Sequence, residues 1–353
     1  MAYKAIDLHC DSVISLMEGK NLRQSVEGVH IDLPRLRTGK VGLQVFAVFI
    51  PPPNGGYEAY SGIGKPYLGG EKAYDFTGKR IDAIEAFIRS DDLLTQVETA
   101  VELKTCLAGD KTGIMIAIEN GQAIEESLEN LEKFRRRKIR LMTLVHSQHL
   151  SWVESCTGKD VFKSDNDQSP GLSDFGGKVV DAMNDLGIIP DVSHSSEKAF
   201  WDVIKRSKKP IIATHSCAYS LCGAARNLKD DQLKALGDSG GLVGVNFSSG
   251  FLSEPFRLAN QHRTAGSKAA VNLSVSVPMS IIADHIDYMI KFAGEDCVGL
   301  GSDFDGIPAA PEGVTGSDFY PKLEDELKSR GYTDKQIEKI FNANFIRVLE
   351  AWD

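Results

Sequence analysis

The chain has 353 residues, of which 42% are hydrophobic and 25% charged, a composition typical of a globular protein. Its formal net charge of −9 argues against a nucleic-acid partner, because a surface that follows phosphates needs clustered Lys and Arg. Six scattered cysteines without a C-x-x-C pair, and the lack of a leader-like N-terminus or a run of ~18 apolar residues, predict a cytoplasmic protein that binds no membrane.

Eight short apolar runs predict buried parallel strands. In chain order they are Ala5–Leu8, Leu43–Ile50, Gly113–Ile118, Ile139–Leu144, Ile188–Asp191, Ile211–Thr214, Leu242–Asn246 and Val298–Gly301. Most are continuous rather than alternating, as expected for strands that are covered on both faces. Helical patterns lie between most of them, at Ile81–Leu107, Ile124–Arg137, Phe175–Leu186, Lys198–Ser207, Asp230–Leu236 and Ile281–Ala293. The tail, Tyr320–Trp352, predicts two or three closing helices, one of which begins near Thr333.

This alternation predicts an α/β fold, a (β/α)8 TIM barrel that spans residues 1–353 as a single domain. Three long insertions, 51–80, 147–173 and 247–277, each follow a predicted strand. In a barrel they would therefore lie on the C-terminal face of the strands, where active sites are built. The first is either a passive surface loop or a lid or subunit contact. The sequence leaves the oligomeric state open, and a homodimer is considered.

Polar residues at the ends of the predicted strands are the most informative feature. His9 and Asp11 lie two residues apart, so on an extended segment they point the same way and can bind one cation. His194 and His215 close two consecutive strands, which predicts a second cation between them, bridged to the first by Glu119. Taken singly, each of these residues is more often a buried residue that is hydrogen-bonded to the protein. Four of the eight histidines, however, close predicted strands at the same end: His9, His146, His194 and His215. The others, His30, His149, His262 and His285, are interpreted as structural.

The last predicted strand leads into Gly301-Ser302-Asp303, where the glycine permits close approach. A carboxylate near two cations stays ionised at neutral pH, so Asp303 can take a proton from water and pass it on. Asp305 is the next candidate for this role.

Together these residues resemble the membrane dipeptidase (renal dipeptidase) family of the amidohydrolase superfamily, from His9 to Trp352. The motifs that carry the resemblance are the H-x-D pair, Ile118-Glu119, the segments around His194 and His215, Ala225-Arg226-Asn227 with Asp230-Asp231, and Gly301-Ser302-Asp303-Phe304-Asp305-Gly306. The resemblance implies two Zn²⁺ ions per chain, or other divalent metals. The ligands would be His9 and Asp11 on one ion, His194 and His215 on the other, and Glu119 shared. It also implies that His146 and Arg226 contact the substrate and that Asp303 handles protons.

The expected function is hydrolysis of the peptide bond of dipeptides by a metal-bridging hydroxide, with a D-residue accepted at the C-terminal position. His146 would stabilise the oxyanion, and Arg226 would pair with the terminal carboxylate of the substrate. Alternatives are a deaminase or lactonase activity on the same site, or a catalytically silent barrel that binds peptides. Arg226 could also be a surface residue paired with Asp230-Asp231. The chain departs from the family pattern at Val145, at Asn120 and in the 51–80 insertion, but it retains every ligand position and resembles the soluble bacterial members.

Overall fold

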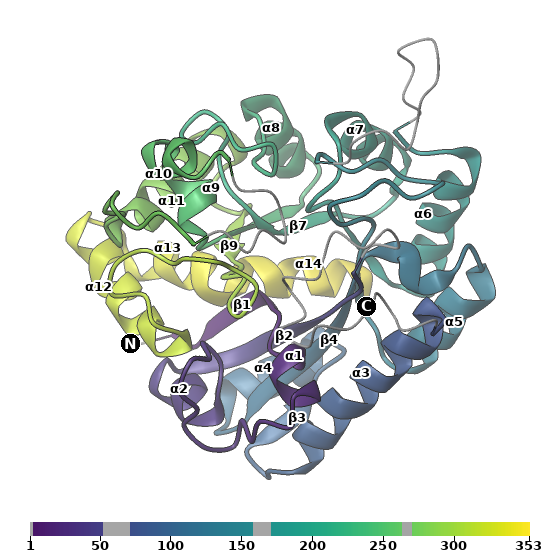
Figure 1. Cartoon of the computed structure of the whole chain (residues 1–353), viewed down its shortest axis with the longest axis horizontal. Helices are drawn as coiled ribbons and strands as arrows, with labels where there is room; N and C mark the ends of the chain where they lie inside the picture. Colours follow the sequence, from purple (N-terminus) through teal and green to yellow (C-terminus); the bar gives the residue numbers. More distant parts are fainter. Residues whose placement is uncertain (1–2, 52–70, 158–170, 263–269) are drawn as a thin grey trace.

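Eight parallel strands close a barrel in the computed structural model, which describes residues 3–51, 71–157, 171–262 and 270–353 (Figure 1). Around the barrel they are β2 (Val41–Phe49), β1 (Ala5–Cys10), β9 (Val298–Leu300), β8 (Leu242–Val245), β7 (Ile212–Ser216), β6 (Ile189–Asp191), β5 (Leu141–Thr143) and β4 (Thr112–Glu119). The pairing of β2 with β4, from Leu43↔Gly113 to Phe49↔Glu119, closes the ring. The predicted (β/α)8 barrel is confirmed, and each predicted strand overlaps an observed one.

A short ninth strand, β3 (Leu94–Gln96), lies outside the ring. It pairs with the first residues of β4, whereas β5 pairs with the last ones. The prediction of one helix over Ile81–Leu107 is therefore wrong: α3 (Ala73–Arg89), β3 and α4 (Ala100–Ala108) occupy this region. The break has a local cause, because the Thr99 side chain accepts from the Glu102 N–H and the Glu102 carboxylate accepts from the Thr99 N–H, a capping box that starts a new helix.

The remaining helices surround the barrel or cross its ends. They are α1 (Val13–Met17), α2 (Leu33–Thr38), α5 (Leu128–Arg136), α6 (Asp174–Leu186), α7 (Glu197–Arg206), α8 (Asp230–Asp238), α9 (Ser249–Leu252), α10 (Glu254–Ala259), α11 (Ser280–Ala293), α12 (Tyr320–Ser329), α13 (Asp334–Glu338) and α14 (Asn344–Trp352). The sequence did not predict α1, α2, α9 and α10, which are too short to show a helical period. The predicted start at Thr333 is confirmed, since Thr333 forms a capping box with Gln336.

Within the described residues, two of the three predicted insertions contain helical structure. The last residues of 51–80 belong to α3, and α9 and α10 lie within 247–277. Residues 52–70, 158–170 and 263–269 lie outside the described residues, and with them the interpretation of the first insertion as a loop, lid or subunit contact. Among the residues that are described, no helix is both long and apolar enough to cross a membrane.

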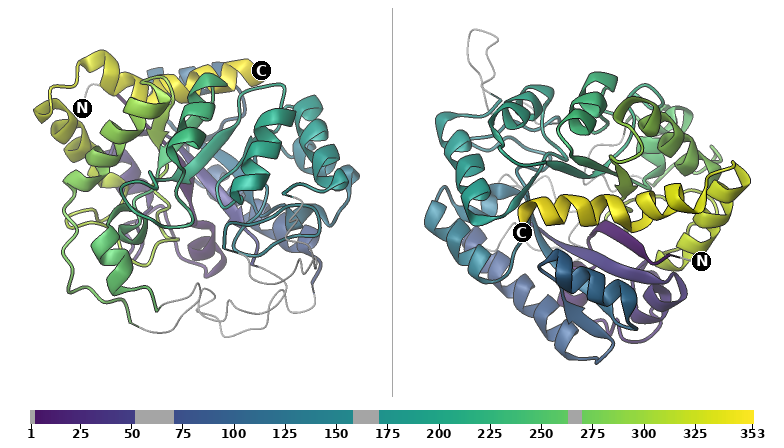
Figure 2. Two further views of the ribbon diagram at one scale, coloured as in Figure 1. Left: turned by 90° about the horizontal axis from the view of Figure 1, so that it is seen from above. Right: turned by 180° about the vertical axis from the view of Figure 1, so that it is seen from behind.

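The C-terminal helix closes one end of the barrel. Phe345, Val348 and Trp352 of α14 share a buried apolar cluster with Ile6 and Leu43, near the start of β1 and β2. Figure 2 (right) shows α14 lying across this end. The amino-terminal end of the barrel is thus filled with apolar side chains, and the carboxyl ends of the strands face the other way.

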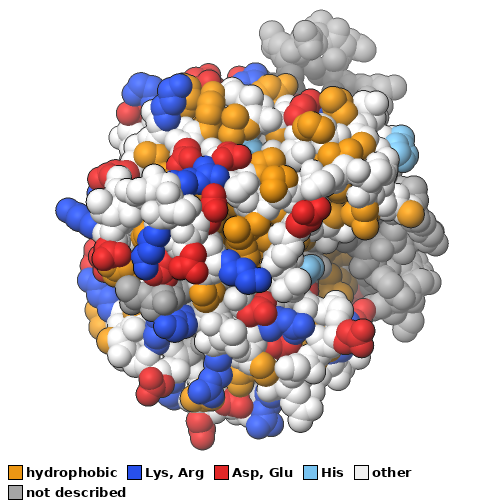
Figure 3. Space-filling view, turned by 90° about the vertical axis from the view of Figure 1, so that its left-hand side faces the viewer, with side chains coloured by type: hydrophobic (Ala, Val, Ile, Leu, Met, Phe, Trp, Pro, Cys, Tyr) orange, Lys and Arg blue, Asp and Glu red, His pale blue; other side chains and the backbone are white. Residues whose placement is uncertain are grey.

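Charges of both signs are interspersed on the face of the molecule drawn in Figure 3. The most basic stretch of the sequence, Arg135–Lys138, pairs with neighbouring elements: Arg135 contacts Glu98, and Arg137 contacts Asp82 and Glu85. These contacts link the end of α5 to α3 and to the segment before α4, so the basic run has a structural role.

Candidate functional site

The predicted site residues lie at the carboxyl ends of the barrel strands. They are His9 in β1 and Asp11 just after it, Glu119 as the last residue of β4, His146 after β5, His194 after β6, His215 in β7 and Asp303 after β9. Parallel strands of a barrel end at one rim, so residues far apart in the sequence meet there. Ligand atoms within 4.8 Å of one another form three groups: His9, Glu119 and His215; Glu119, His146 and His194; and His9, Asp11 and Asp303.

Glu119 stands at the centre of this cluster and is almost fully buried. Its Oε2 lies 3.6 Å from His9 Nε2, whereas its Oε1 lies 3.2 Å from His194 Nε2 and 3.6 Å from His215 Nε2. The two oxygens therefore face different sets of imidazoles. His146 also approaches Oε1, with its Nε2 at 3.7 Å.

The backbone turns sharply where three of the strands leave the barrel. His194, Asp303 and Asn120, the residue after Glu119, have φ values of 68°, 62° and 92°. Residues other than glycine seldom adopt a positive φ, and those that do are often found at functional sites. Gly306 closes the turn after Asp303, and a Cβ on it would lie 1.9 Å from Asp11 Oδ2, so only glycine fits against this carboxylate.

The charges of the cluster are unbalanced. Burial raises the pKa of Asp11 well above its usual value and also raises that of Asp303, and the charge of Glu119 adds to both effects. Burial opposes a charge on His9, yet Glu119 raises the pKa of His9 to about 10. Burial lowers the pKa of His194 and of His215 well below the usual range. The cluster thus combines carboxylates that repel one another with one protonated imidazole, that of His9, and the neutral imidazoles of His194 and His215, a set that a further cation would stabilise.

Several buried atoms of the cluster have no hydrogen-bond partner among the described residues. They are His9 Nε2 and Asp11 Oδ1, and also His194 Nδ1, which is not the ring nitrogen that faces Glu119. In addition, His194 Nε2 and His215 Nε2 lie only 3.0 Å apart. Buried polar atoms without partners are costly, so their convergence needs an explanation. Imidazole nitrogens and carboxylate oxygens are the ligands that zinc and similar divalent ions prefer, and the residues therefore fit metal ions.

Arg226 reaches this cluster from the loop after β7. It is only 7% exposed, and its Nη2 donates to the carbonyl oxygen of His215 at 3.0 Å. Its Nε and Nη1 have no hydrogen-bond partner in the described part of the chain. The alternative of a surface arginine paired with the start of α8 is wrong, because Arg226 is buried and Asp230 accepts instead from Ser220 and Tyr288. N–H groups of the guanidinium thus remain available for an anion.

Two contacts at the rim had not been predicted. Asn246, which follows β8, donates from Nδ2 to Asp303 Oδ2 at 2.8 Å. Asp305 accepts from the Ser12 hydroxyl and from the backbone N–H of His30, so both of its oxygens are engaged. Asn246 could have been found by the same criterion as the histidines, a polar residue closing a strand, had amides been included.

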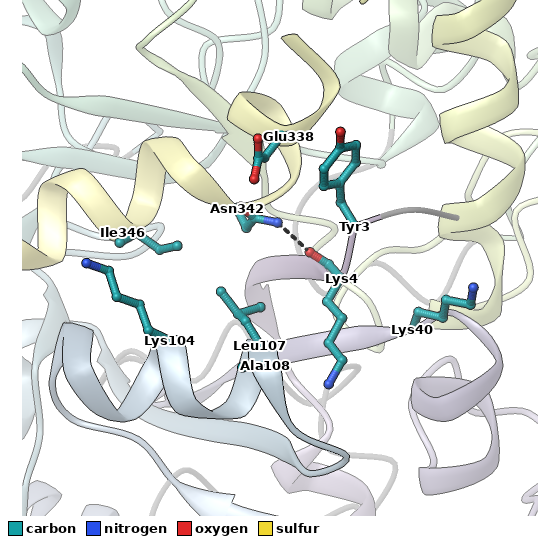
Figure 4. A pocket seen from close by; sticks show the side chains of 9 residues that line it. All are labelled: Tyr3, Lys4, Lys40, Lys104, Leu107, Ala108, Glu338, Asn342 and Ile346. Carbon is teal, nitrogen blue, oxygen red and sulfur yellow. Dashed lines mark hydrogen bonds between the residues drawn. The ribbon is translucent and has the colours of Figure 1, made fainter. Parts of the chain in front are cut away.

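A cavity of about 500 Å³ lies at the end of the barrel opposite to the rim with Glu119 (Figure 4). Lys4, Lys40 and Lys104 line it, together with Glu338 and Asn342, whose Nδ2 donates to the Lys4 carbonyl at 3.0 Å. Lysines do not serve as ordinary metal ligands, and a single carboxylate does not make a binding site for a divalent ion. The rim with Glu119 is therefore the candidate site.

The whole chain, residues 1–353, matches the membrane dipeptidase family (peptidase family M19). The chain belongs to this family. It is 30% identical to mouse dipeptidase 3 over 339 residues, which cover 94% of this chain but only 59% of that protein. Two crystal structures are similar over all of this chain and at least 99% of theirs. One is the family M19 metallopeptidase dipeptidase AC, with a TM-score of 0.82 and 27% identity. The other is a metallopeptidase from Rhodobacter sphaeroides bound to a phosphinate mimic of L-Ala-D-Ala, with a TM-score of 0.83 and 26% identity.

Divalent metal should stabilise this member of the dipeptidase family against unfolding, because it would relieve the repulsion among the buried carboxylates. Zn²⁺ at 100 times its dissociation constant should add ~2.7 kcal/mol per site to the free energy of unfolding. The measurement is thermal unfolding of protein treated with a chelator and then reloaded with Zn²⁺. The shift should shrink in His194→Ala, and equal melting temperatures with and without Zn²⁺ would argue against a metal site.

Proposed function

We propose that the protein is a zinc-dependent dipeptidase with two Zn²⁺ ions per chain. The observation that carries the proposal is the placement of Arg226, a buried guanidinium with free N–H groups, beside a cluster of carboxylates and imidazoles. A substrate that satisfies both features needs a terminal carboxylate a short distance from the bond that is hydrolysed. A dipeptide meets this requirement, whereas a lactone or an amine to be deaminated does not need such a carboxylate.

The distances support the ligand assignment that the family resemblance implies. His9 and Asp11 would hold one ion, His194 and His215 the other, and Glu119 both, because its Oε2 faces His9 and its Oε1 faces His194 and His215. When bound, two such metal ions supply a Lewis acid and lower the pKa of the water that they bind. Family membership and the donor set support metal dependence, and zinc is the ion that these ligands favour.

The protein's own groups would position the dipeptide and move its protons. Burial lowers the pKa of His146 to about 4, despite the charge of Glu119, so this imidazole is neutral and can donate an N–H to the developing oxyanion. Asp303, oriented by Asn246, would accept a proton from the attacking water and deliver it to the leaving amine. Arg226 would bind the terminal carboxylate through two parallel hydrogen bonds.

We further propose that the C-terminal residue of the dipeptide can have the D configuration. The Rhodobacter sphaeroides metallopeptidase binds a phosphinate mimic of L-Ala-D-Ala, and its whole chain is similar to this one. Comparing hydrolysis of matched L,L- and L,D-dipeptides by the zinc-loaded protein tests this part. Cleavage of L,L-substrates alone would refute the proposed acceptance of a D-residue, and it would leave the proposed metal site unaffected.

Asp303→Asn should reduce kcat by roughly 10²–10⁴, the usual contribution of a general acid–base group, because the amide cannot accept the proton of water. Metal content should be retained, since the substitution preserves size and the contact with Asn246 can still form. Asp305→Asn is the matched control: the Asp305 carboxylate is engaged by Ser12 and His30, and its loss should affect kcat far less. Comparable kcat values for wild type and Asp303→Asn would show that Asp303 does not transfer the proton.

Removing the Arg226 guanidinium should cost about 2–5 kcal/mol of binding to the terminal carboxylate, the range for a buried charge pair. In Arg226→Met, kcat/KM for dipeptides should therefore fall by tens to thousands of times, at ~1.4 kcal/mol per tenfold. Arg226→Lys should restore little, because a point charge does not reproduce the planar fork. Amidation of the dipeptide's C-terminus should impair wild type strongly and the variants little. If amidation impairs all three proteins equally, Arg226 does not bind the carboxylate.

A further inference from the structure

A chain of buried hydrogen bonds leads from Asp191, at the end of β6, to the ring of His215 in β7. Thr214 Oγ1 lies 2.6 Å from Asp191 Oδ2 and 2.8 Å from His215 Nδ1. Asp191, Thr214 and His215 are each at most 2% exposed. The far side of the His215 ring, Nε2, faces Glu119 and His194. The three residues therefore connect the interior of the barrel wall with the candidate metal site.

The partners of Asp191 fix the direction of these hydrogen bonds. Its Oδ1 accepts from the backbone N–H groups of Ser193 and Thr214, both at 2.9 Å. Its Oδ2 accepts hydrogen bonds from the hydroxyls of Thr143 and Thr214, both at 2.6 Å. Four donors fill the four acceptor positions of an ionised carboxylate, which has no proton to give. The hydroxyl proton of Thr214 therefore points to Asp191.

The direction of the Thr214 hydroxyl determines which ring nitrogen of His215 carries the hydrogen. With its proton committed to Asp191, Thr214 Oγ1 turns a lone pair toward His215 Nδ1, so Nδ1 carries the N–H. The neutral ring then has its free lone pair at Nε2, directed at the cluster. The backbone is fixed in the same place, because the N–H of His215 donates to Ser193 Oγ at 3.2 Å. Both the tautomer and the orientation of the ring are thus set before any ion binds.

We propose that Asp191 and Thr214 are positioning residues that hold His215 in the tautomer required for metal binding through Nε2. Groups that orient a metal-binding histidine in this way contribute to metal affinity although they never touch the metal. His194 has no such support among the described residues, since its Nδ1 is buried without a partner. His215 is accordingly the preorganised member of the pair. This inference rests on the proposed function only in taking His215 as a metal ligand.

Thr214→Val tests the inference, because valine has the shape of threonine without its hydroxyl. Zn²⁺ affinity, measured by competition with a chromogenic chelator at fixed pH, should fall by roughly 10–100-fold, the usual effect of losing such a group. Thr143→Val is the matched control: it removes a hydrogen bond of the same length from the same oxygen of Asp191, and among the described residues no hydrogen bond joins Thr143 to His215. Thr143→Val and Thr214→Ser should both bind Zn²⁺ about as tightly as wild type. Equal losses in Thr143→Val and Thr214→Val, or no loss in either, would overturn the proposal.

Asp191→Asn gives a second, independent test. The amide has a donor where the carboxylate had an acceptor, which allows the Thr214 hydroxyl to turn toward His215 and displace the proton from Nδ1. Metal affinity should fall, and adding Thr214→Val should then cost little more, because both changes act through one hydrogen bond. Additive losses in the double variant would contradict the proposal.

The tautomer can also be observed directly, without a variant that alters the chain of hydrogen bonds. Nitrogen NMR of metal-free wild type labelled with ¹⁵N-histidine should show the proton of His215 on Nδ1, the signals being assigned from their absence in His215→Gln. A proton on Nε2 would refute the inference even if Thr214→Val failed to fold. The outcome is separable from that of the proposed function. Suppose that zinc binding depends on Thr214 but that the protein hydrolyses no dipeptide. The inference about Thr214 would then hold, and the proposed dipeptidase activity would be refuted.

Discussion

The main constraint on the structure is the mutual repulsion of three carboxylates, those of the buried Asp11 and Glu119 and of the partly buried Asp303, which meet where the barrel strands end. Burying one ionised carboxylate is costly, and burying several together is tolerated only when opposite charge compensates them. The protein supplies imidazoles that are mostly neutral and one guanidinium, that of Arg226. Divalent cations are the simplest compensation, and the donor atoms are of the kind that such ions bind.

The barrel makes this concentration of charge possible. The apolar cluster beneath α14 fills the amino-terminal end of the barrel, and a larger cluster, which includes Ile84, Phe134 and Ile286 of the surrounding helices, provides most of the buried apolar surface. The other rim is thus free to carry polar groups that contribute little to stability by themselves. Residues with left-handed backbone, such as His194 and Asp303, occur at this rim, where strain is tolerated because the surrounding strands hold the chain in place.

Much of this arrangement could be predicted from the sequence, because strands in a barrel end at one rim and the polar residues that follow them must meet. His9, Glu119, His194 and His215 were found in this way. The strand β3 was missed because its three residues carry no clear pattern and the capping box at Thr99 lies within an otherwise helical stretch. The burial of Arg226 depends on the path of a loop, which no local pattern encodes. The role of Asp191 depends on the direction of hydrogen bonds, and these require coordinates.

We propose that the cluster around Glu119 binds two divalent ions that hydrolysis of a dipeptide requires. The most direct test is elemental analysis of the purified protein combined with a dipeptidase assay before and after chelation. We expect close to two divalent ions per chain, loss of hydrolysis when they are removed, and recovery of hydrolysis when Zn²⁺ is returned. Full hydrolytic activity in a protein that contains no metal would contradict it.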